Sequence, residues 1–280
     1  MIEMTHDSYG KAGVRLMKVD RGDEPHRVTE LTVDIRLEGD LADGYTEGDN
    51  TQVLPTDTMK NTVYALAKSH RVSTPDRFGL VLADHFVETQ PQIHRATVDI
   101  AERPWEHIDA GDGPHPRAFT QARGERRLSR VDRTFDETVV EGGIRDLVIL
   151  KSTDSGFSNF VEDEYTTLDE TDDRVLATSL EASWRYTSTD VDYDELHDEI
   201  RKTLIGVFAD HESLSVQHTL HAMGTAVLEE FSDVDKIHIE MPNKHNLPVD
   251  LKPFDMDHDY EILKPIDEPS GLIEATLQRG

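Results

Sequence analysis

The segment 151–174, KSTDSGFSNFVEDEYTTLDETDDR, keeps aromatic side chains and a closing arginine in a run that is otherwise acidic. The aromatic residues are Phe157, Phe160 and Tyr165, and the arginine is Arg174. A solvated acidic loop would account for the acids alone. A ring face also stacks on flat conjugated molecules, and a guanidinium binds anions through parallel hydrogen bonds. The segment is therefore a candidate for one side of a pocket that binds a planar anion.

Three further polar clusters lie where predicted elements meet, and each also has a purely structural explanation. Lys11 precedes a predicted strand, where a single lysine is usually solvated. Thr56 and Asp57 stand where a helix begins and could cap it through their side-chain oxygens. Asn243 and His245 directly follow a predicted strand and could be turn residues.

Metal binding has one weak candidate in the sequence. His218 and His221 are three residues apart on a predicted helix and could share one face. A zinc site needs at least a third protein ligand, and none stands at a recognisable spacing. We therefore expect ordinary surface or core histidines and no metal site.

The charge balance is strongly acidic throughout the chain. Lys and Arg total 29 against 57 Asp and Glu, which gives a net charge of −28. About 1 M salt shortens the Debye length to roughly 3 Å and screens such self-repulsion. Because the acids are scattered and form no tail or block, we interpret the composition as halophilic adaptation to a salty cytoplasm. Nucleic acid is not expected as a partner, since no basic patch is evident.

Other classes are excluded by composition and by the hydropathy of the sequence. The 280-residue chain contains no cysteine, which excludes disulfides, thiol nucleophiles and iron–sulfur clusters. No run approaches the roughly 18 apolar residues of a membrane span, and the first residues lack the apolar core of a signal peptide. We expect a cytoplasmic protein that does not bind membranes.

The periodicity predicts one arrangement of elements twice along the chain. In the first half we expect strands at 11–20 and 27–38, two helices beginning at 56 and 75, and strands at 93–104, 117–124 and 133–141. In the second half the same order returns, with strands at 144–152 and 174–186, helices at 192–211 and 215–232, and strands at 235–242 and 271–278. This duplication predicts an α+β fold of antiparallel sheets with helices on one face. The exposed sheet edges favour assembly of several copies.

The order and spacing of several segments resemble the urate oxidase (uricase) family. The segments are YGKAGVRLMKV, VLPTDTMKNTVYALAK, LKSTDSGFSNFVEDEYTTLDETDDRVLATSLEASWRY, SVQ, MPNKH and GLIEATLQR. Together they extend from about residue 8 to residue 279.

The resemblance implies two tandem T-fold (tunnelling-fold) domains, at 1–141 and 142–280, and a homotetramer with active sites between subunits. It implies oxidation of urate by O2 to 5-hydroxyisourate and hydrogen peroxide in purine degradation. It also implies that the reaction needs no metal, flavin or other cofactor.

The resemblance assigns the substrate pocket residue by residue. Phe157 would stack on the purine ring, and Arg174 would bind the anion. Gln217 would read the opposite edge of the substrate, Val216 would offer its backbone N–H, and Leu168 would form part of the pocket wall.

The same resemblance assigns the remaining roles. Thr56 and Asp57 of a neighbouring subunit would close the site, and Lys11, Thr56 and His245 would form a proton relay. Asn243 would lie above the substrate plane and, with Thr56, hold O2 and later water or peroxide.

Two alternatives remain open on the sequence. Another T-fold enzyme acting on a purine or pterin would commonly use zinc held by Cys or His, and the chain has no Cys. A non-catalytic purine-binding relative would be expected to have lost Lys11, Thr56 or His245, and all three are present.

Overall fold

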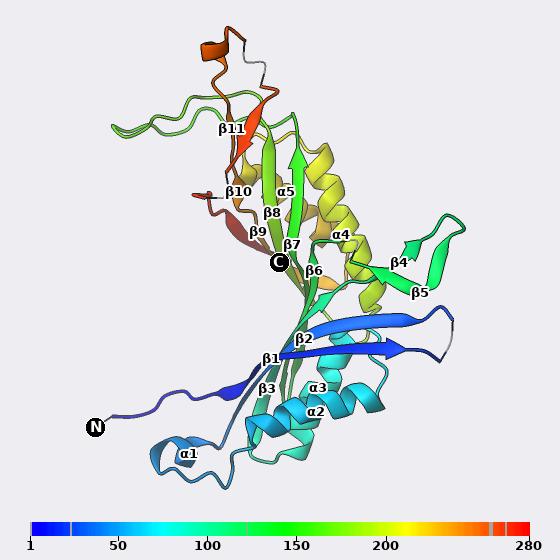
Figure 1. Ribbon diagram of the computed structural model, residues 1–280. Coiled ribbons are helices and arrows are strands. Elements are labelled where there is room, and N and C mark those ends of the chain that lie inside the picture. Colours follow the sequence, from blue (N-terminus) through cyan, green and yellow to red (C-terminus); the bar gives the residue numbers. More distant parts are fainter. Residues whose placement is uncertain (1, 23, 122, 258–259, 267) are drawn as a thin grey trace. The chain divides into compact units, whose positions relative to one another are not determined.

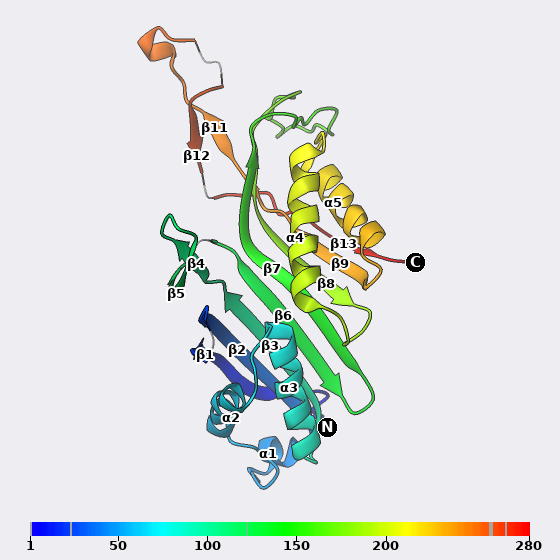
Figure 2. The same ribbon diagram turned by 90° about the vertical axis from the view of Figure 1, so that its right-hand side faces the viewer.

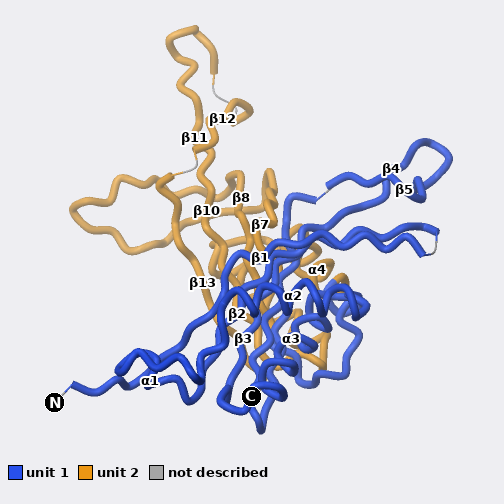
Figure 3. The backbone as a smooth tube through the Cα atoms, turned by 60° about the horizontal axis from the view of Figure 1, so that its bottom comes forward, with its two compact units in different colours: residues 1–143, 185–197 blue, residues 144–184, 198–280 orange. Residues whose placement is uncertain are grey.

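The computed structural model describes residues 2–22, 24–121, 123–257, 260–266 and 268–280 (Figure 1). The chain forms two compact units, coloured separately in Figure 3. Unit 1 contains residues 1–143 and 185–197, and unit 2 contains residues 144–184 and 198–280. The segment 185–197 therefore belongs to the first unit although it follows part of the second in the sequence. A domain boundary after residue 141 stays a prediction.

Unit 1 is built on an antiparallel sheet in the order β1-β2-β3-β6. Figure 2 shows two helices on one face of this sheet. The bounds are β1 (Tyr9–Asp20), β2 (Arg27–Gly39), β3 (Ile93–Arg103), β6 (Arg126–Thr134), α2 (Thr56–Ser69) and α3 (Pro75–Thr89). A short helix α1 (Ala42–Thr46) and a hairpin of β4 (Glu106–Asp109) and β5 (Pro114–Thr120) are additions to this core.

The core of unit 1 follows from the alternation of apolar residues in β2. Leu31, Val33 and Leu37 are completely buried, because every second residue of a strand points to the same face. The helix α3 packs closely on that face. A side chain at Gly79 of α3 would place its Cβ 2.8 Å from Val131 of β6, so only glycine permits this approach.

A buried ionic group joins β6 to α3 and to the segment 185–197 within unit 1. Arg127, 8% exposed, donates to the fully buried Asp76 at 2.7 Å and to Asp194 at 2.5 Å. It also donates to the carbonyl oxygen of Tyr193 at 3.0 Å. These hydrogen bonds offset the cost of burying the charges.

The strands of unit 2 lie in the order β7-β8-β9-β13 within the main sheet, and β10 pairs with β8. The helices α4 and α5 cover one face, as Figure 2 shows. The bounds are β7 (Thr138–Lys151), β8 (Leu176–Tyr186), β9 (Val234–Glu240), β10 (Asn243–Lys244), β13 (Glu274–Gln278), α4 (Tyr193–Asp210) and α5 (Val216–Glu230). A smaller hairpin pairs β11 (Asn246–Pro248) with β12 (Leu263–Pro265). The 3-10 helix η1 (Lys252–Phe254) stands between these two strands in the sequence.

The predicted fold class is confirmed, because each half contains two strands, two helices and two strands in that order. Two strand predictions were wrong in detail. The segment 117–124 contributes to the β4-β5 hairpin and not to the main sheet. The segment 133–141 contains a turn in which the Thr134 N–H donates to the carbonyl of Glu137 at 2.8 Å. This turn joins β6 to β7. The frequent arginines of β6 obscure the alternation of apolar and polar residues in its sequence.

The structure also corrects the expected cap of α2. Pro55 occupies the N-cap position, and neither Thr56 nor Asp57 caps the helix through its side chain. Asp57 instead accepts hydrogen bonds from Lys60 at 2.5 Å and Asn61 at 3.0 Å. No helix in the described ranges has the length and apolar character needed to cross a bilayer.

Candidate active site

Three segments of unit 2 are joined by backbone hydrogen bonds around Phe157. The Phe157 N–H donates to the carbonyl of Thr171 at 2.7 Å, and the Thr171 N–H donates back at 3.0 Å. On the other side, the Gly156 N–H donates to the carbonyl of Ser213 at 2.8 Å, and the Ser213 N–H donates to Asp154 at 2.9 Å. Phe157 is thus fixed between the segment that leads to Arg174 and the segment that leads into α5.

Glycine at position 156 is required by this close approach. A Cβ there would lie 3.0 Å from the carbonyl oxygen of Asp172 and 3.1 Å from that of Thr171. Such contacts are tighter than ordinary packing, so a larger residue would push the two segments apart. Gly156 therefore helps to set the separation between Phe157 and the segment that ends at Arg174.

Arg174 and Phe157 form the centre of the candidate pocket. The guanidinium carbon of Arg174 lies 5.4 Å from the centroid of the Phe157 ring. The ring of Phe160 lies nearly parallel to that of Phe157, with centroids 5.0 Å apart and planes 14° apart. A planar partner would stack on a face of Phe157 that Phe160 does not cover.

The charge of Arg174 is not neutralised by a side chain. Its Nε is buried, and no described residue accepts a hydrogen bond from it. Burial lowers the pKa of Arg174, and no carboxylate of the described ranges counteracts that effect. A half-buried guanidinium with an unsatisfied donor is costly unless an anion pairs with it. The arrangement is therefore suited to an anionic ligand.

The beginning of α5 supplies further donors next to this region. Ser215 caps the helix by accepting from the His218 N–H at 3.1 Å. The N–H groups of Val216 and Gln217, in the first turn, have no partner within the helix and lie at its positive end. Val216 is 3% exposed, whereas the Gln217 side chain is exposed. Backbone and side-chain donors are thus available together.

Asn243 and His245 lie along the strand that Arg174 leads into. Asn243 pairs with Thr178 of β8, and its N–H donates to the carbonyl of Gly271 at 2.9 Å. The carbonyl of His245 accepts from the Ile266 N–H at 3.0 Å. Both residues are half-buried, so neither is a simple exposed turn residue.

Unit 1 brings Lys11 close to the first turn of α2. A hydrogen bond from Lys60 is the main reason that the pKa of Asp57 is lowered, and the charge of Lys11 contributes to the same effect. Tyr9 donates to the carbonyl of Leu54 at 3.1 Å and ties β1 to the segment before α2. Lys11, Thr56 and Asp57 therefore belong to one local cluster.

A bulge in β1 follows Lys11 and lies beside a small cavity. The pairing register shifts between Lys11 and Val14, and Gly13 adopts a φ of +68°, which favours glycine. The Gly13 N–H donates to Asp34 at 2.5 Å. Lys11 lines a cavity of about 280 Å³ together with Ser8, Tyr9, Gly10, Ala12, Asp34, Ile35, Arg36 and Asp99.

The predicted residues thus fall into two local groups. Unit 1 holds Lys11, Thr56 and Asp57, and unit 2 holds Phe157, Leu168, Arg174, Val216, Gln217, Asn243 and His245. Leu168 is 56% exposed in the loop between Phe157 and Thr171, and its place in a pocket wall stays a prediction. Sequence reasoning missed Ser215, although a serine directly before an apolar helix is a recognisable N-cap signal.

Two units, each with four antiparallel strands and two helices on one face, define a protein of the tandem T-fold class. The model of the family described as Uricase matches residues 7–132 and 140–274. The chain belongs to the uricase family.

Individual relatives support this assignment over at least 90% of their lengths. The uricase of Arthrobacter globiformis is 40% identical over 278 residues, which cover 99% of this chain and 90% of the relative. The uricase of Dictyostelium discoideum is 35% identical over 282 residues, covering 100% and 98%. The crystal structure of the Arthrobacter globiformis uricase matches with a TM-score of 0.95 at 40% identity, covering 100% of this chain and 96% of that chain.

Proposed function

We propose that this member of the uricase family oxidises urate with O2 to 5-hydroxyisourate and hydrogen peroxide, without a metal or organic cofactor. The observation that carries the proposal within the site is Arg174, whose buried Nε has no hydrogen-bond partner among the described residues and whose guanidinium carbon lies 5.4 Å from the Phe157 ring centroid. A flat anion would satisfy the charge and the ring face together.

Substrate binding would use the unit 2 group. Phe157 would stack on the purine, and Arg174 would donate to its anionic edge through a planar fork. Gln217 and the Val216 N–H would bind the opposite edge, where carbonyl and N–H groups of urate need partners. Leu168 would exclude water at the pocket wall.

Proton transfer would use Lys11, Thr56 and His245. The hydroxyl of Thr56 is not used to cap α2, so it is available for this role. Urate would supply the two electrons that reduce O2 to hydrogen peroxide, and a lysine coupled to a hydroxyl and an imidazole can move the two protons that accompany them. Asn243 and Thr56 would hold O2 and then the water that adds to the oxidised ring, while Asp57 would help close the site.

Several subunits would be needed to complete each active site. We infer a homotetramer in which the unit 1 group of one subunit and the unit 2 group of another complete each site. Among the described residues, β1 and β13 are the end strands of the main sheet, and unpaired strand edges favour such assembly. We interpret the net charge of −28 as salt adaptation, and we propose a cytoplasmic location from the hydropathy of the sequence.

The direct test is incubation of chelator-treated protein with urate and dissolved O2 at about 1 M salt, where charge repulsion is screened. We expect the ultraviolet band of urate to disappear with release of an equal amount of hydrogen peroxide. Urate binding without turnover would favour the non-catalytic relative. Turnover of a pterin or another purine that requires added zinc would favour the other T-fold enzyme.

A further inference from the structure

A histidine and two glutamates meet on the face of the unit 2 sheet that points away from α5. In the pairing of β9 with β13, Glu240 is opposite Glu274 and His238 is opposite Thr276. Ile237 and Leu277 point the other way, toward Gly224 of α5, where a Cβ would lie 3.5 Å and 3.0 Å from their respective side-chain atoms.

Because side chains alternate along a strand, His238, Glu240, Glu274 and Thr276 all share the opposite face. This shared face is set by the pairing register and not by a chance rotamer. Any ligand bound by these residues would therefore bridge β9 and β13.

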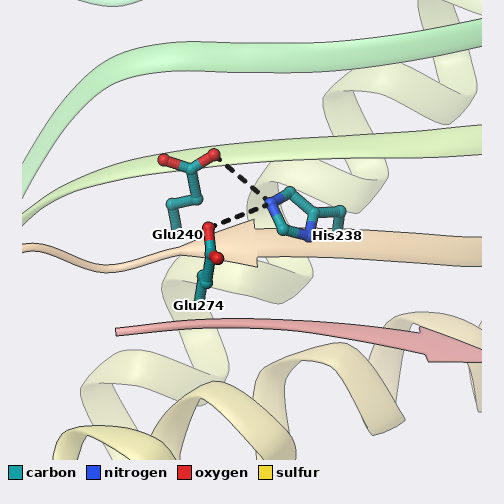
Figure 4. Close-up of side chains that lie close together, drawn as sticks. All are labelled: His238, Glu240 and Glu274. Carbon is teal, nitrogen blue, oxygen red and sulfur yellow. Dashed lines mark hydrogen bonds and ion pairs between the residues drawn. The ribbon is translucent and has the colours of Figure 1, made fainter. Parts of the chain in front are cut away.

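The histidine is placed between the two carboxylates. His238 Nε2 lies 3.3 Å from Glu240 Oε1 and 3.9 Å from Glu274 Oε2, as Figure 4 shows. One ligand atom from each residue can be chosen so that all lie within 4.8 Å of one another. Zinc binds imidazole nitrogen and carboxylate oxygen at about 2.0–2.2 Å, so small rotations of the half-buried Glu240 and the exposed Glu274 would bring the atoms to coordination distance.

Two further features favour a cation at this position. Glutamates directly opposite each other in a sheet repel, and a divalent cation removes that cost. The other ring nitrogen, His238 Nδ1, lies 2.8 Å from the Thr276 hydroxyl. When Nδ1–H donates to that hydroxyl, Nε2 keeps its lone pair and points it between the carboxylates.

We propose that His238, Glu240 and Glu274 bind a divalent transition-metal ion of the zinc type, which ties the C-terminal strand β13 to β9. A neutral imidazole and two carboxylates balance the charge of such an ion and leave a position for water. Thr276 is a positioning residue that fixes the tautomer of His238. The site shares no residue with the proposed urate pocket, and the proposal does not rest on urate oxidation.

The test is to titrate Zn²⁺ into untagged, chelator-treated full-length protein in the presence of excess Mg²⁺. Calorimetry measures the binding. Magnesium competes for the general acidic surface but binds imidazole poorly. We expect one Zn²⁺ per chain and a rise in the unfolding temperature by mass action. Cobalt should give visible absorption bands that shift when an imidazole ligand is lost.

His238→Gln and Glu274→Gln should each weaken zinc binding by about tenfold or more, and Thr276→Val by about tenfold. The matched control is His221→Gln, an exposed histidine of α5 that should leave zinc binding unchanged. Circular dichroism of each metal-free variant checks that it remains folded. Absence of zinc binding by the parent protein, or binding that His238→Gln leaves unchanged, would overturn the proposal.

Discussion

At the scale of single residues, the candidate pocket depends on side chains whose polar groups are left unused by the fold. The buried Nε of Arg174 has no partner in the described part of the chain, and the side chain of Thr56 does not cap the helix it begins. Asp57, by contrast, is held by Lys60 and Asn61. Replacing residues such as Arg174 and Thr56 should therefore affect activity more than stability.

Replacement of Arg174 by alanine should reduce kcat/KM for urate by an amount equivalent to roughly 2–5 kcal/mol, mainly through KM, because the bound anion loses its charged partner. Steady-state kinetics at fixed salt measures this. Arg145→Ala is the control, since Arg145 pairs with Glu181 at 3.1 Å and is half exposed. An unchanged KM in Arg174→Ala would show that the pocket is misassigned.

Thr56→Val should lower kcat by about 10²-fold or more, because a positioned proton-transfer group typically contributes that much. Its thermal stability should stay close to that of the parent, since no cap is lost. Thr56→Ser keeps the hydroxyl and should retain most of the activity. Full kcat in the valine variant would remove Thr56 from the relay.

At the scale of elements, periodicity predicts the strands and helices well, but not the contacts that build the pocket. The alternation of Leu31, Val33, Ile35 and Leu37 identifies β2 directly. The proximity of Phe157 and Arg174 to α5 instead depends on isolated backbone bridges from 155 to 213 and from 157 to 171. Those bridges link distant segments without any repeat, so only the family resemblance pointed to their association.

The buried ion pair of unit 1 gives a test of element packing. Arg127→Met leaves Asp76 buried without its partner and should lower the free energy of unfolding by about 3–5 kcal/mol. Arg130→Met, which breaks an exposed pair with Asp99 at 3.3 Å, should cost at most about 1 kcal/mol. Urea unfolding at constant salt compares the two, and equal effects would contradict the assigned role of Arg127.

At the scale of the whole molecule, the surplus of acids should make stability depend on ionic strength. Raising salt toward about 1 M should increase the unfolding temperature, because screening weakens repulsion within a chain of net charge −28. Thermal scans in a KCl series measure this. Maximal stability in dilute buffer would argue against salt adaptation.

Assembly at this scale decides whether the two residue groups act on one substrate molecule. Lys11 belongs to unit 1 and Arg174 to unit 2. If each site takes one group from each of two subunits, a chain defective in Lys11 and a chain defective in Arg174 can complete each other's sites. Such complementation is impossible when both groups of a site come from the same chain.

The most direct measurement of this account is therefore urate oxidation, at a urate concentration below the parental KM, by a co-expressed mixture of Lys11→Met and Arg174→Ala chains, with each variant alone as control. Random pairing predicts up to about a quarter of the parental activity in the mixture, far above either variant alone. Activity no higher than that of the separate variants would contradict a urate site shared between subunits.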